Sequence, residues 1–191
     1  MCLYLKKGNA RKKIATEDIV CYKVMEEVFL KGDFTGGVPH CVPHYKTPYQ
    51  GNIMPIKGLV RDEYFDNNPW AAKRYNKKMT TQRIYANNTD HICESFVSGG
   101  MIHTFADLLD ASEKAYSLAD ALQNKTYVVV KCVIPKGTEY FEGFTGMCRV
   151  GSINFGAPSY CSSKLQFTGE IVDKNGKYWE EEKDNINTST C

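Results

Sequence analysis

Apolar side chains occur in short, nearly unbroken runs along the chain, and the longest of these runs have the length of strands. Two such runs are expected as strands, near residues 18–25 and 126–134, and a third strand is expected near 164–172. The run near 126–134 is rich in β-branched residues, which fit a largely buried strand in a pleated sheet. These runs predict a twisted sheet, either mixed or antiparallel.

A different spacing marks residues 105–123, where apolar side chains recur every three or four positions. Thr104 can cap a helix whose third position is Asp107, which is a variant of the capping box with a shorter carboxylate. Asn124 follows the last apolar position. The pattern predicts one main covering helix at about 105–123, packed on the sheet.

Turn residues divide the rest of the chain. Residues 32–51 are rich in Gly and Pro, and because Pro fixes φ and lacks a backbone donor, we expect a long ordered Pro/Gly-rich loop there. The pair Asn175–Gly176, followed by Tyr178–Trp179, predicts a two-residue hairpin. Residues 180–191 are polar and acidic and are expected as a frayed tail.

A chain of 191 residues suits one domain rather than two. We therefore predict the α+β class, with a single domain at 1–179 and the polar acidic tail at 180–191. Hydrophobic residues make up 42% and charged residues 24%, which excludes disordered and collagen-like chains. The formal net charge of +2 adds no preference for a partner.

The N-terminal segment reaches a lysine after five residues, so no signal peptide is expected. No apolar run approaches the roughly 20 residues of a membrane span. A cytoplasmic location without membrane contact follows as the expectation, in the host bacterium if a phage encodes the protein, and the eight cysteines should then remain thiols.

The sequence contains none of the common catalytic signatures: no nucleophile elbow, no phosphate-cradling Gly-x-x-x-x-Gly-Lys loop and no dinucleotide-binding glycine motif. His40, Cys41 and His44 are residue types that zinc accepts, but their spacing is poor for a structural site, and His91 and Cys93 do not improve it. We expect no cofactor, no metal and no catalytic residue.

Candidate binding residues lie beside the predicted helix and in the loops. His103 and Thr104 precede the expected helix, whose free N–H groups and dipole favour an anion, although a histidine there is often a packing residue. Aromatic and polar side chains elsewhere offer stacking faces and donors for a base and a phosphate, or they form only a packed surface. These residues are Tyr22, Tyr49, Gln50, Ser163 and Lys164.

Several segments together resemble a family of small uncharacterised proteins from phages and mobile elements of gut Bacteroides-type bacteria. The resemblance runs from Met1 to about Val172, with 32–37, 64–96 and 143–158 less typical. It implies a phage accessory origin, and such proteins often counter host defence by binding a host protein or by sequestering a nucleotide signal. The residues that carry it are 19–25, Thr47-Pro48-Tyr49-Gln50, Ile102-His103-Thr104-Phe105 with Asp110-Ala111, and 128–141.

The chain is also weakly similar to ADP-ribosyltransferase folds. This similarity implies a first-strand binding element at Cys21-Tyr22-Lys23, a second element at His103-Thr104-Phe105 and a late acid at Glu170. Lys23 stands where an arginine would hold a phosphate with two parallel hydrogen bonds, and the late Glu-x-Glu pair is absent. The similarity therefore implies a relative that binds a nucleotide without turning it over.

The leading hypothesis is a phage-type accessory protein that binds or sequesters a small anionic ligand, such as a nucleotide-derived signal, without catalysis. One alternative is an NAD-using enzyme of the ADP-ribosyltransferase type. Another is a protein-binding inhibitor of a host factor, with the basic segments at 6–13 and 73–83 as its contact surface. A homo-oligomer, with a dimer as the default, is expected.

Overall fold

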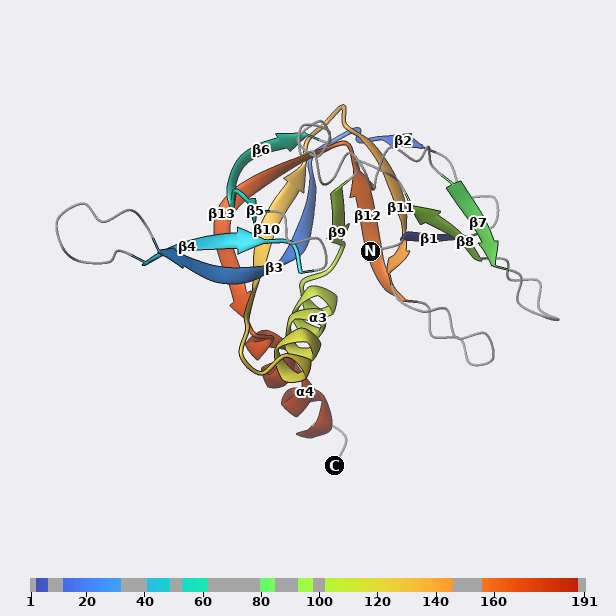
Figure 1. Cartoon of the computed structure of the whole chain (residues 1–191). Coiled ribbons are helices and arrows are strands. Elements are labelled where there is room, and N and C mark those ends of the chain that lie inside the picture. The colour runs from blue at the N-terminus through green and yellow to red at the C-terminus, as the bar shows by residue number, and fades with distance from the viewer. Residues whose placement is uncertain are drawn as a thin grey trace.

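The structure of the protein is a computed structural model, and it shows a sheet-rich molecule with some helix (Figure 1). Within the described residues, thirteen strands form one sheet and two helices lie beside it. Every strand pair among them is antiparallel. The described residues are 3–6, 12–31, 41–48, 53–61, 80–84, 93–97, 102–145 and 156–188.

The main path of the sheet contains ten strands, and three short or peripheral strands join it at the side. In spatial order the path is β6 (Lys57–Arg61), β13 (Lys164–Lys174), β10 (Thr126–Ile134), β3 (Ile19–Lys31), β9 (Ile102–Phe105), β12 (Ala157–Ser162), β11 (Glu139–Thr145), β1 (Leu3–Lys6), β8 (Cys93–Val97) and β7 (Thr80–Ile84). Off this path, β2 (Lys13–Ile14) pairs with β11, and β4 (Cys41–Lys46) pairs with β3 and with β5 (Ile53–Met54).

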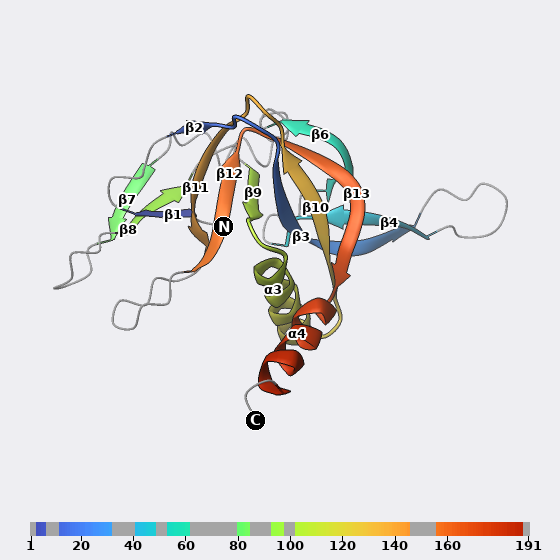
Figure 2. The ribbon, with the colours of Figure 1, turned by 180° about the vertical axis from the view of Figure 1, so that it is seen from behind.

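The sheet divides into two groups of strands between β3 and β9. A single residue pair, Tyr22 with Phe105, joins these two strands. Further along the same edge, β3 pairs with β4 from Glu26 onward. Figures 1 and 2 show β3, β10 and β13 diverging from β9, β12 and β11 on either side of this point. We call the place where β3 and β9 meet the β3–β9 junction.

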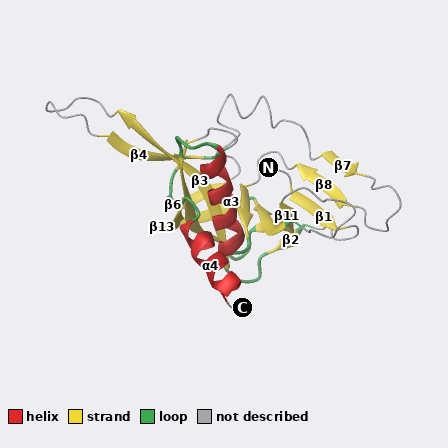
Figure 3. Ribbon diagram, turned by 90° about the horizontal axis from the view of Figure 1, so that it is seen from below, coloured by secondary structure: helices red, strands yellow, loops and turns green. Residues whose placement is uncertain are grey.

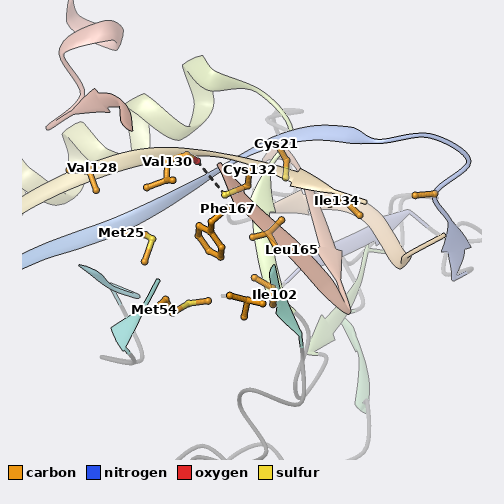
Figure 4. Packing of buried hydrophobic residues seen from close by; sticks show 12 residues of the cluster. Cys21, Met25, Met54, Ile102, Val128, Val130, Cys132, Ile134, Leu165 and Phe167 are labelled. Carbon is orange, nitrogen blue, oxygen red and sulfur yellow. Dashed lines mark hydrogen bonds between the residues drawn. The ribbon is translucent and has the colours of Figure 1, made fainter. Parts of the chain in front are cut away.

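Alternate residues of the central strands face two separate cores. In β10, Val128, Val130 and Cys132 belong to one cluster with Leu165 and Phe167, shown in Figure 4. Their neighbours in β10, Tyr127 and Val129, belong to a second cluster with Phe105 and residues of α3 (Leu108–Ala121). Because both faces of β10 are largely buried, its sequence is an apolar run interrupted only at Lys131 rather than an alternating pattern.

Helix α3 begins later than the sequence predicted. Its N-cap is Asp107, whose carboxylate accepts a hydrogen bond from the Leu109 amide at 2.7 Å. Thr104, predicted as the cap, is instead an extended residue of β9, because the backbone through Phe105 pairs with β12. Ala111, Ala115 and Leu118 face the sheet, and the short side chains of the two alanines allow close packing.

The turn after β13 leads into a helix and not into the predicted hairpin strand. Asn175 and Gly176 adopt φ of 57° and 78°, as a primed turn requires, but α4 (Lys177–Thr188) follows directly. The Tyr178 amide donates to Asp173 Oδ1 at 3.2 Å and the Trp179 amide to Ser112 Oγ at 2.9 Å. These acceptors cap the first turn of the helix, so the expected hairpin and frayed tail are both wrong at 177–188.

A buried hydrogen bond joins the two side chains, from α3 and β13, that cap α4. Ser112 Oγ in α3 donates to Asp173 Oδ2 in β13 at 2.7 Å, and both residues are buried. Figure 3, which views the molecule from below, shows α3 and α4 side by side in front of the sheet. The single covering helix predicted at about 105–123 is therefore joined by a second one.

Two further expectations need correction. The segment 32–51, predicted as one long loop, includes β4, in which Pro43 pairs opposite Phe29. Part of the basic segment 73–83 forms β7 at Thr80–Ile84, while 62–79 lie outside the described residues. Pro43 is tolerated because its side chain is exposed and β4 is a peripheral strand.

Among the described residues, no helix combines the length and the apolar character needed to cross a membrane.

Candidate functional site

Lys23 lies in β3 at the β3–β9 junction, one residue after the last backbone pair with β9. Its side chain is only 8% exposed, and its ammonium Nζ donates to the backbone carbonyl of His103 at 2.8 Å. This hydrogen bond spans the point where the two groups of strands separate. The lysine therefore supplies a donor that the backbone ladder does not provide there.

The surroundings of Lys23 disfavour a charged amine. Burial lowers the pKa of Lys23, while the nearby thiols of Cys132, Cys161 and Cys21 act in the opposite direction and do not offset it. Within the described part of the chain, no carboxylate contacts the Lys23 ammonium. A buried amine without a counter-ion is costly for a fold, and such groups concentrate at functional sites.

His103 lies in β9, beside Lys23. The sequence had predicted it at the start of a helix, and that prediction is wrong. His103 is half-buried, and its Nε2 is 3.3 Å from the Sγ of Cys161, its partner in β12. Its Nδ1 is buried and has no hydrogen-bond partner among the described residues. Burial is the main cause that lowers the pKa of His103 to about 3, and the Lys23 charge makes a smaller contribution in the same direction. The imidazole is therefore neutral near pH 7 and acts by hydrogen bonding only.

The N-terminus of α3 is itself unsuited to an anion. Asp107 occupies the cap, and Asp110 lies in the first turn. Burial and the charges of Asp107 and Glu113 raise the pKa of Asp110. This acidic end replaces the anion-binding helix start that His103 and Thr104 were predicted to mark.

Tyr22 and Thr104 frame the junction on opposite faces of the sheet. The Tyr22 ring packs against the cluster under α3, so it faces away from its neighbour Lys23. Thr104 is buried, and its hydroxyl lies beside the Cys21 thiol. The junction thus brings Lys23, His103 and Thr104 together, while Tyr22 contributes to the helix-covered core.

A separate pair of cationic residues, Arg61 and Lys164, lies near the point where β12 passes into β13. Ser163 connects the strands, and its amide and hydroxyl both donate to the Glu139 carbonyl, at 3.0 and 3.4 Å. Lys164 stands directly opposite Arg61 of β6. Two like charges at opposite positions repel each other, and an anion between them would relieve the repulsion. Sequence reasoning missed Arg61, because only the β6–β13 register reveals its position.

Other expected residues are placed elsewhere or lie outside the described residues. Three of them, Tyr49, Gln50 and His40, lie outside the described residues. Within the described part of the chain, no three His, Cys, Asp or Glu side chains are grouped so that they could hold a metal. Glu170, the late acid implied by the weak similarity, pairs with Lys131 Nζ at 3.2 Å and is exposed.

Glu170 also lies on the wrong face for an ADP-ribosyltransferase site. Its partner Lys131 is the β10 residue opposite Tyr22, so its side chain points to the Tyr22 face of the sheet. Lys23 points to the other face. The described geometry therefore does not bring the acid to the junction residues.

No protein-family model, no curated protein and no solved structure matches this chain.

Proposed function

We propose that the protein binds a small anionic ligand at the β3–β9 junction and holds it without chemical change. The observation that carries this proposal is Lys23, a buried amine with one backbone acceptor and no carboxylate beside it among the described residues. A bound anion supplies the missing counter-charge. A nucleotide-derived signal has the required charge, and sequestration of such a signal would suit a phage accessory protein that counters host defence.

Binding at Lys23 is expected to depend on pH. Burial lowers the pKa of the free amine, and a bound anion favours the protonated form. Binding therefore takes up a proton, and affinity rises as pH falls toward the pKa of Lys23. Arg61 and Lys164 offer further positive charge at the β12–β13 connection for a ligand with more than one anionic group.

The test compares ligand retention by matched variants. The purified protein is incubated with a small-molecule extract of bacterial cells, passed through gel filtration and heated, and the released compounds are identified by mass spectrometry. Lys23→Met removes the buried amine but keeps an unbranched chain of similar volume. Lys131→Met is the matched control, since Lys131 lies in the adjacent strand, on the opposite face, in a partly exposed ion pair.

Release of an unaltered nucleotide from the natural protein and from Lys131→Met, but not from Lys23→Met, supports the proposal. Equal release from Lys23→Met contradicts it, as does an empty protein, which would favour a protein partner. A chemically altered nucleotide would favour the transferase alternative. Lys164→Met is a second, partly exposed variant for the case in which Lys23→Met fails to fold, and it should weaken retention.

A further inference from the structure

Cys21 in β3 and Cys132 in β10 are directly opposite each other in the antiparallel ladder. Opposite residues project from the same face of a sheet, and both side chains are fully buried in one core cluster, where Figure 4 labels them. Opposite Cα atoms in antiparallel strands are about 4.5 or about 5.5 Å apart, depending on the type of pair. Both separations fall within the range of about 4.4–6.8 Å that disulfides span.

Each thiol has one other weak contact, and for Cys21 this contact is with the Thr104 hydroxyl. The Cys132 thiol donates to the Val130 carbonyl in its own strand at 3.5 Å, which is a weak contact for sulfur. Cys21 has Lys23 two residues further along the same face, and this positive charge favours thiolate formation at both cysteines. Because the two residues are opposite each other on one face, a disulfide between them requires no change in strand register.

We propose that Cys21 and Cys132 are a modification site, which hydrogen peroxide converts to a cross-strand disulfide. The Cys21 thiolate attacks one peroxide oxygen, which forms a sulfenic acid and, with the thiol proton, releases one water. The Cys132 sulfur then attacks the sulfenic sulfur, and the hydroxyl leaves with the Cys132 proton as a second water. Two thiols are oxidised by two electrons and one peroxide is reduced, so the step balances.

The order of attack follows from the surroundings of the two thiols. Burial raises the pKa of Cys21 to about 11 and raises that of Cys132 further. Cys21 therefore provides more thiolate and reacts first. Both groups are mostly protonated near pH 7, so oxidation is slow there, and its rate rises about tenfold per pH unit.

Peptide mapping of the full-length protein tests the pair. Reduced protein is treated with hydrogen peroxide, unfolded in the presence of an alkylating agent and digested with trypsin without reductant. Cys21 lies in the tryptic peptide 14–23 and Cys132 in the peptide 132–136, and neither contains a second cysteine. We expect these two peptides to be joined, and joined faster at pH 9 than at pH 7.

Two variants separate this site from the other cysteines. Cys132→Ser should abolish the joined peptides, whereas Cys161→Ser, which changes another buried cysteine near Lys23, should leave them. Recovery of both peptides in alkylated form after peroxide treatment would overturn the proposal. So would a link from Cys21 to the Cys161 peptide, 150–164. None of these outcomes depends on the anionic ligand proposed above.

Discussion

Among Gly58, Gly137, Gly169 and Gly176, Gly176 is the position where the addition of one methyl group should do most damage to the fold. It has a φ of 78°, and a Cβ built on it would lie 2.3 Å from the Cβ of Tyr116 in α3 and 2.7 Å from the Tyr116 backbone. Carbon atoms in contact are about 3.5–4.0 Å apart, so the turn and α3 would have to separate by more than about 1 Å. Gly137 offers a matched control, because its φ is 80° and a Cβ there meets nothing within 4 Å.

The difference between these two glycines sets the expected magnitude. Alanine in the left-handed region costs about 1–2 kcal/mol at either site. At Gly176, overpacking adds about 1–3 kcal/mol, because the obstacle is helix backbone rather than a flexible side chain. Gly176→Ala should therefore lower the free energy of unfolding by about 2 kcal/mol more than Gly137→Ala does. For a chain of this size, that difference corresponds to a Tm lower by about 4–8 °C.

The assay is urea unfolding of the two variants and the natural protein, followed by circular dichroism, with Tm values from calorimetry. Equal losses in Gly176→Ala and Gly137→Ala would refute the reasoning, because they would show that α3 and the turn do not approach as closely as the structure has them. A loss confined to Gly176→Ala would instead show that backbone conformation alone costs little.

Three further predictions concern separate parts of the fold. The pKa of His103 is lower in the folded state, so the unfolded state binds its proton first and stability falls as pH drops from about 6.5 toward 3. His103→Gln should remove about 2 kcal/mol of that loss between pH 6.5 and 4.5, measured by urea unfolding, and identical pH profiles would contradict this. Asp173→Ala leaves the Ser112 hydroxyl and the first turn of α4 without their acceptor. The free energy of unfolding, measured by chemical unfolding, should fall by about 2–4 kcal/mol. A change near zero would show that the buried contact is not formed. Phe167→Ala should cost about 3–5 kcal/mol in the same assay while exposed Phe29→Ala costs under about 0.5, and similar values for both would place the core elsewhere.

Strands buried on both faces were predictable from the sequence. The runs near 18–25 and 126–134 correspond to β3 and β10, because residues that face two cores must be apolar at successive positions. The strand expected near 164–172 corresponds to β13, in which the buried Leu165 and Phe167 alternate with less buried residues. The four residues of β9 include His103 and Thr104, and this short, half-polar strand gave no such signal. Its neighbourhood was therefore assigned to the start of the helix.

The meeting of the site residues was beyond sequence reasoning. Lys23 and His103 were both named as candidates, but their contact joins positions 80 residues apart through the carbonyl of one and the amine of the other. Arg61 was not named, because its position opposite Lys164 depends on the β6–β13 register. Asn175–Gly176 was predicted as a turn and is one, yet no local pattern shows that Asp173 and Ser112 cap a helix after it.

The pairing of β3 also has a consequence for synthesis of the chain. The C-terminal half of β3 pairs with β4, which follows within about 15 residues. Its N-terminal half pairs with β10, roughly 100 residues later in the sequence. At about 5–20 residues per second, the ribosome needs about 5–20 s to deliver that partner. The apolar central strand therefore emerges early and waits with an open edge, and a nascent chain that stalls before β10 should be prone to aggregation or to capture by chaperones.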